Sequence, residues 1–143
     1  MSSADSERSF EWYDAWILCT LLIGVHYENP VSLALVIGVA DGINKAMITR
    51  SELEDGLGRL VTSGFVRVDG GKFELTPKAM ALEPLTVGRC MDNISEAIGA
   101  REWEPGLKMP STETEVYVTR EAYRRAEKEY RRRDFWEKHK KPE

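Results

Sequence analysis

The stretch that decides the fold is ELEDGLGRLVTSGFVRVDGGKFELTPKA, which runs from Glu52 to Ala79. Its first third predicts a helix with one apolar face, because apolar residues recur at intervals of three and four: Leu53, Leu57, Leu60 and Val61. Thr49 stands three residues before Glu52, which is the spacing of a capping box that starts a helix. Gly64 supplies the left-handed residue that commonly ends one.

The rest of the stretch predicts a β-hairpin. Phe65 to Val68 and Lys72 to Leu75 are short β-prone runs, and Asp69, Gly70 and Gly71 between them favour a tight turn. Thr76 and Pro77 are typical of the cap and the first position of a further helix.

Two apolar helices are expected before this stretch, over Trp12 to Tyr27 and over Val31 to Asp41, the second ended by Gly42. The first is expected to have a broad buried face, and the second is apolar enough to be buried on most sides. Trp12 and Trp16, with Trp103 further on, are expected as core or interface anchors, and an aromatic ligand pocket is the alternative.

After the hairpin, the spacing of apolar residues predicts a helix over Val87 to Gly99, followed by a loop over Arg101 to Thr112. Val116 to Val118 is a candidate strand, and Thr119 can cap a final helix that reaches at least Trp136. The expected class is therefore mainly α with a small β-hairpin (α+β), in one compact unit of 143 residues.

Helix, helix, turn, capped helix, hairpin and then Leu-Thr-Pro is an order that resembles the winged helix-turn-helix regulators of the PadR-like and MarR-like type. The likeness rests on the leucine-spaced helix leading into "GFV", the glycine-tipped hairpin and "LTP". It covers residues 10–83, and residues 84–143 would then be a C-terminal helical extension that packs on the same domain or on a dimer partner.

The resemblance implies that the first turn of the third helix enters the major groove and that the hairpin, called the wing, touches phosphate or the minor groove. It nominates Arg50, Ser51, Glu54, Arg59 and Lys72 as DNA contacts, and Arg67 is a second base on the wing. The third helix nevertheless carries three acids, Glu52, Glu54 and Asp55, which disfavours contact with a polyanion.

The net charge of -4 is unevenly distributed. Residues 1–119 have a balance of -8, whereas Arg120 to Lys141 has a balance of +5. This basic tail, with Arg124 and Arg131 as representative contacts, is the main argument from charge for nucleic acid, although the interpretation given next is the favoured one. The alternative is a solvated or partner-packing helix, because acids precede bases by four residues at several positions, as in Glu121 to Arg125.

Other classes of function have little support. Neither histidine, His26 or His139, lies in a metal-ligand spacing, so no metal, cofactor or enzyme activity is expected. Cys19 and Cys90 are expected as core thiols rather than as a disulfide. The apolar runs are too short to cross a membrane and the N-terminus lacks a signal-peptide pattern, so a cytoplasmic setting is expected.

Two functions remain open. The first is a homodimeric winged-helix protein that binds duplex DNA as a transcriptional regulator, through the third helix, the wing and the basic tail. The second is a winged-helix module that binds a protein partner through its acidic third-helix face or its last helix, without DNA.

Overall fold

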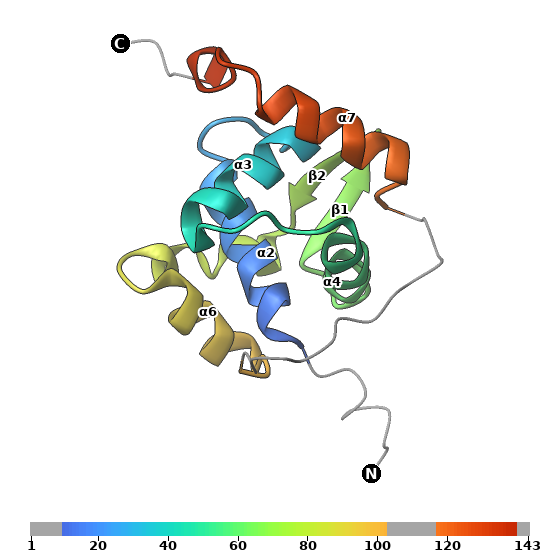
Figure 1. Ribbon diagram of the computed structural model, residues 1–143. Helices are drawn as coiled ribbons and strands as arrows, with labels where there is room; N and C mark the ends of the chain where they lie inside the picture. The colour runs from blue at the N-terminus through green and yellow to red at the C-terminus, as the bar shows by residue number, and fades with distance from the viewer. Residues whose placement is uncertain (1–9, 103–116, 140–143) are drawn as a thin grey trace.

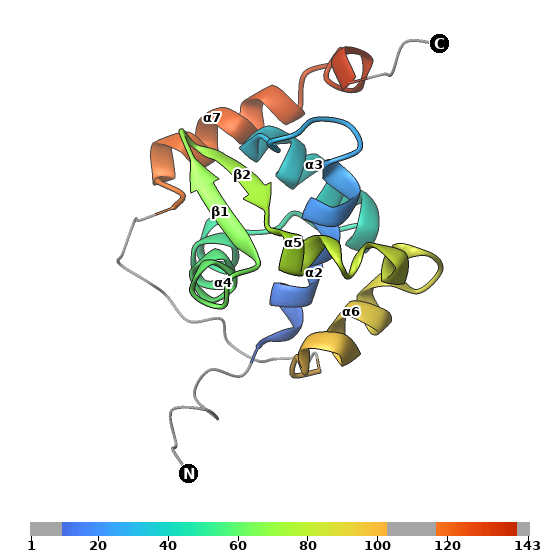
Figure 2. The same cartoon turned by 180° about the vertical axis from the view of Figure 1, so that it is seen from behind.

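The computed structural model describes residues 10–102 and 117–139. It is mainly helical with one small antiparallel sheet, as expected from the sequence. The elements in chain order are α2 (Trp12–Gly24), α3 (Leu33–Asn44), α4 (Arg50–Thr62), β1 (Val66–Asp69), β2 (Lys72–Leu75), α5 (Pro77–Met80), η1 (Glu83–Thr86), α6 (Cys90–Ile98), α7 (Arg120–Tyr130) and η2 (Trp136–His139). Helix α2 lies at the centre, and α6 and α7 lie at opposite ends of the molecule (Figures 1 and 2).

Helix α2 is the core of the molecule. Its side chains are buried almost all round, because α3, α4 and α6 pack against different sides of it. Trp16 is 1% exposed, and its indole Nε1 donates to the Ala40 carbonyl at 2.9 Å, which ties α2 to α3. A helix this apolar is stable only when it is enclosed.

Helix α3 begins later and ends later than the sequence predicts. Ser32 caps it by accepting a hydrogen bond from the Leu35 N–H at 3.3 Å, and the chain continues in helical conformation through Gly42. The helix ends at Lys45, which takes the left-handed conformation with φ of 53°. Gly42 is therefore an interior helical residue, and the prediction that it ends the helix was wrong.

Helix α4 starts as predicted. The Thr49 N–H donates to Glu52 Oε1 at 2.9 Å, and the Glu52 N–H donates to Thr49 Oγ1 at 3.1 Å, which confirms the capping box. The leucines of the predicted stripe, at positions 53, 57 and 60, are at most 1% exposed. Each fully buried leucine contributes about 1.5–3 kcal/mol by leaving water.

The predicted hairpin forms with Val66 opposite Leu75 and Asp69 opposite Lys72. Val31, in the segment between α2 and α3, pairs with Phe73 through two backbone hydrogen bonds of 2.8 and 2.9 Å. The hairpin is thus fixed to the helical body at Phe73, near its turn, by the short segment that contains Val31.

Two helices beyond the hairpin are shorter than predicted. Helix α6 begins at Cys90, because Gly88 has a φ of 78° and Val87 is 79% exposed. Helix α7 ends at Tyr130, and the chain turns so that Phe135 returns to the core, 1% exposed, with its ring 5.4 Å from that of Tyr130. Val118 is not in a strand, and Val116 and Trp103 lie outside the described residues.

None of the helices within residues 10–102 and 117–139 combines the length and apolar character needed to cross a bilayer.

Candidate nucleic-acid interface

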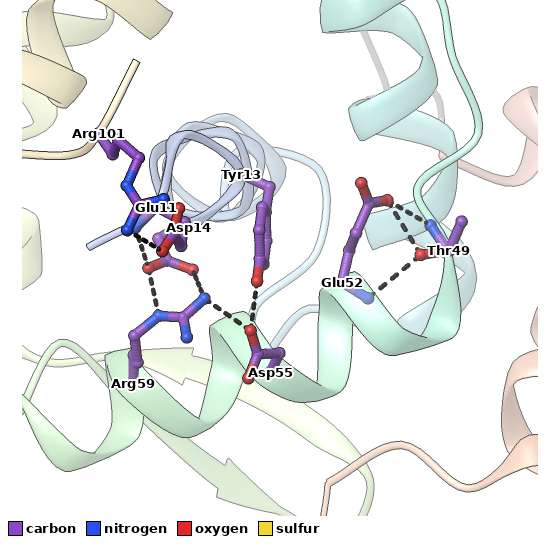
Figure 3. A network of polar contacts seen from close by, with 8 residues as sticks. All are labelled: Glu11, Tyr13, Asp14, Thr49, Glu52, Asp55, Arg59 and Arg101. Carbon is purple, nitrogen blue, oxygen red and sulfur yellow. Dashed lines mark hydrogen bonds and ion pairs between the residues drawn. The ribbon is translucent and has the colours of Figure 1, made fainter. Parts of the chain in front are cut away.

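The predicted contact Arg59 lies on the side of α4 that faces α2. Its guanidinium binds Asp14 in a fork, with Nε to Oδ2 at 2.6 Å and Nη2 to Oδ1 at 2.9 Å, and it also reaches Asp55 at 2.9 Å. The Tyr13 hydroxyl donates to the same Asp55 carboxylate (Figure 3). The Arg59 donors are therefore directed into an internal network.

Asp14 is the buried member of this network, with a fully covered side chain. Burial raises the pKa of its carboxyl from an ordinary 3.8 to about 6, against the opposing effect of the Arg59 hydrogen bonds. The carboxyl is ionised at neutral pH, and Arg59 then supplies the opposite charge that such a buried group requires.

Another flank of α4 is covered by the C-terminal arm, which we define as residues 117–139. Glu54 is 4% exposed and accepts the backbone N–H groups of Tyr117 at 3.1 Å and Val118 at 2.8 Å. Arg50 Nη1 donates to the Val118 carbonyl at 2.7 Å. A Cβ at Gly58 would lie 3.8 Å from the Tyr117 ring. Positions 50, 54 and 58, one turn apart, thus share a face that contacts the arm.

Helix α7 continues the arm across α3, as both ribbon views show (Figures 1 and 2). The Tyr123 hydroxyl donates to the Ile48 carbonyl at 2.5 Å, and the Tyr130 hydroxyl donates to Asp41 at 2.6 Å. Ala126 between them is 6% exposed. This narrow stripe is the docked side of α7.

The bases of α7 are turned to solvent. Arg120, Arg124 and Lys128 are exposed and follow one another at intervals of four residues, which places them on one stripe of the helix. Arg131, just past the helix, is exposed and pairs with Glu127 at 3.1 Å. Within the described residues, no carboxylate lies within 4.0 Å of Arg124 or Lys128.

The two bases predicted on the hairpin are exposed and weakly paired. Arg67 lies 3.7 Å from Glu74 across the hairpin, and Lys72 lies 3.8 Å from Glu28. Ion pairs as exposed as these contribute little to stability, so either cation can exchange its carboxylate for another anion.

The structure therefore divides the predicted contacts into three groups. Arg50 and Glu54 both contact the arm, Arg59 points toward α2, and the bases of the hairpin and α7 face solvent. Ser51 is half-buried at the start of α4. The sequence did not reveal that Asp14 is the partner of Arg59. The one signal was Gly56, since glycine inside a helix is unfavourable unless something approaches closely, and a Cβ there would lie 2.8 Å from Asp14 Oδ1.

A groove of about 1110 Å³ lies between α2, the α3–α4 turn and α6. Trp12 and Trp16 line it, together with four acids and no Lys or Arg: Glu52, Asp92, Glu96 and Glu102. A lining of this charge does not suit a polyanion. His26 is at the exposed end of α2 and pairs with Glu83 at 2.7 Å, and the described residues contain no cluster of His, Cys, Asp and Glu that could hold a metal ion.

Comparison of the chain with models of known protein families, with curated proteins and with solved structures found no match.

Proposed function

We propose that this chain is a winged helix-turn-helix protein that binds duplex DNA as a transcriptional regulator. The order of elements supports the fold. Helices α2, α3 and α4 are followed by the hairpin, which pairs through Phe73 with Val31 in the segment between α2 and α3. The PadR-like and MarR-like resemblance is part of the same proposal.

The observation that carries the DNA-binding function is the orientation of α7. The helix docks through Tyr123, Ala126 and Tyr130, so Arg120, Arg124 and Lys128 project from the molecule as an exposed basic stripe. Phosphate contacts of this kind supply most non-specific affinity for DNA. The wing bases Arg67 and Lys72 add two cations to those of α7. A regulator of this type implies a homodimer and a cytoplasmic location.

The experiment measures the affinity of the protein for a mixed-sequence duplex by fluorescence anisotropy over a range of salt concentrations. We expect the affinity to fall steeply with salt, and Arg124→Ala and Lys128→Ala each to reduce the slope of log K against log salt by about one. The matched control is Arg89→Ala, which removes one exposed base near α6, at the opposite end of the molecule.

Absence of salt-dependent binding would exclude the proposed function. An equal loss of affinity in Arg89→Ala would show that net charge, rather than the α7 stripe, controls binding.

A second candidate function has one observation in its favour. The flank of α4 already binds main-chain atoms of another segment: Glu54 accepts the N–H groups of Tyr117 and Val118, and Arg50 donates to the Val118 carbonyl. A protein-interaction module would use this face for a partner's peptide, as in other recognition of extended chains. Failure of the anisotropy experiment at low salt favours this candidate.

A further inference from the structure

We propose that the C-terminal arm is a latch on α4. When the latch is closed, Tyr117 and Val118 occupy the flank formed by Arg50, Glu54 and Gly58, and DNA reaches this flank only after the arm is released. The inference rests on the proposed DNA-binding function and adds its regulation: the closed form offers DNA the hairpin and the docked α7 stripe, and the open form offers the flank of α4.

The first argument is the way α4 holds the arm. Both Glu54 and Arg50 bind main-chain atoms of the arm. The Glu54 carboxylate accepts two N–H groups, and the Arg50 guanidinium donates to a carbonyl. Hydrogen bonds in which one partner is charged are roughly twice as strong as neutral ones. The arm is therefore bound at this point as a peptide ligand would be.

The second argument is the close packing at the other end of the arm. A Cβ added at Gly38 of α3 would lie 2.9 Å from Tyr130 Cδ1 and 3.1 Å from Trp136 Cζ2. These rings therefore lie directly against the α3 backbone. Because docking depends on this close approach and on a narrow stripe of side chains, it is sensitive to a single added methyl group.

The third argument is that the same side chains cannot serve the arm and DNA together. Arg50 gives a donor to Val118 that a phosphate would otherwise use, and Glu54 gives the arm the oxygen that could accept from the exocyclic amine of cytosine. Release of the arm is required before either side chain can take its role in readout. The arm and DNA are thus mutually exclusive ligands of this flank.

The first test opens the latch without changing charge. Gly38→Ala places a methyl group against Tyr130 and Trp136, whereas Gly42→Ala lies in the same helix and its Cβ meets nothing within 4 Å. Amide hydrogen exchange of residues 117–130 should be about tenfold faster in Gly38→Ala, which corresponds to about 1.4 kcal/mol, and should be unchanged in Gly42→Ala.

A second variant acts at the other contact. Glu54→Gln keeps the size of the side chain and removes its charge, so the amides of Tyr117 and Val118 should exchange faster than in the unmodified protein. Glu121→Gln is the matched control, since Glu121 is exposed on α7 and pairs with Arg125 instead of α4.

The DNA readout uses a pool of duplexes with a randomised centre, from which each protein selects its ligands. We expect Gly38→Ala to enrich particular sequences more strongly than the unmodified protein and Gly42→Ala do, because its α4 flank is open for a larger fraction of the time. A gain of selectivity cannot be produced by partial unfolding.

The outcomes separate the two proposals. Unchanged exchange in both Gly38→Ala and Glu54→Gln overturns the latch. Faster exchange with equal enrichment by all proteins overturns its control of DNA binding. Faster exchange, with no protein retaining duplexes at low salt, supports the latch as a moving element and overturns the proposed function.

Discussion

Arg59 and Asp14 lie 45 residues apart in the chain and are joined by two hydrogen bonds in fork geometry, at 2.6 and 2.9 Å. The pair connects α4 to the central helix α2 (Figure 3). A charged pair at this depth contributes less through its own attraction than through the large cost of removing one partner.

The first prediction concerns Arg59. Arg59→Met leaves the Asp14 carboxylate buried without its cation, and it should lower the free energy of unfolding by about 3 kcal/mol at neutral pH. Arg59→Lys should lose part of the same amount, because an ammonium group cannot form the fork. Urea denaturation measures both. Arg67→Met, which removes an exposed base, should leave stability within about 0.5 kcal/mol.

The second prediction is a pH dependence caused by Asp14. Its pKa is about 6 in the folded protein and an ordinary 3.8 when unfolded, so between these values the folded state binds more protons. The free energy of unfolding of the unmodified protein, measured relative to that of the non-titrating variant Asp14→Asn, should therefore fall as pH rises from about 4 to about 6 and then level off. The difference between the two pKa values limits this fall in the free energy of unfolding to about 3 kcal/mol. An NMR titration of the Asp14 carboxyl carbon that gave an ordinary pKa would contradict this account.

The third prediction compares two glycines of α4. A Cβ at Gly56 would overlap Ile17 Cδ1 and lie 2.8 Å from Asp14 Oδ1, so Gly56→Ala should destabilise by about 1–3 kcal/mol. Gly58→Ala, in the same helix, meets only an ordinary contact and should be neutral or stabilising by up to about 1 kcal/mol. Thermal unfolding of the two variants should therefore shift in different directions.

The fourth prediction concerns the two thiols. A hydrogen bond from the Cys19 thiol lowers the pKa of Cys90, while the same contact and burial raise the pKa of Cys19. Cys90 is also the more exposed of the two, at 8% against 0%. Iodoacetamide at neutral pH should label Cys90 first, as mass spectrometry of a digest will show. The variant Cys19→Ser, which retains Cys90, should still be labelled. If Cys90→Ser, which retains Cys19, is labelled faster than Cys19→Ser, the prediction is contradicted.

The sequence predicted the elements well where the signal is local. Thr49 and Glu52 start α4 through hydrogen bonds between near neighbours, and the hairpin follows from its turn residues. Helix ends set by distant contacts were predicted less well. Periodicity alone continued the final helix to Trp136, whereas the chain leaves α7 at Tyr130 to bury Phe135.

The candidate site was predictable only as a set of residue types. The resemblance nominated Arg50, Glu54 and Arg59 together because they share a helix, but their partners come from segments 45 to 68 residues away. No local pattern encodes such pairings. The basic stripe of α7 was visible in the sequence, since it depends only on helical spacing.

The enclosure of α2 also limits how the chain can be divided. Helix α6 covers one side of α2, although it follows the hairpin in the sequence. A chain truncated after residue 83 would leave that side open to water, with apolar side chains that have no other cover. Residues 10–83 alone therefore do not enclose α2, and fragment studies should retain residues up to at least the end of α6.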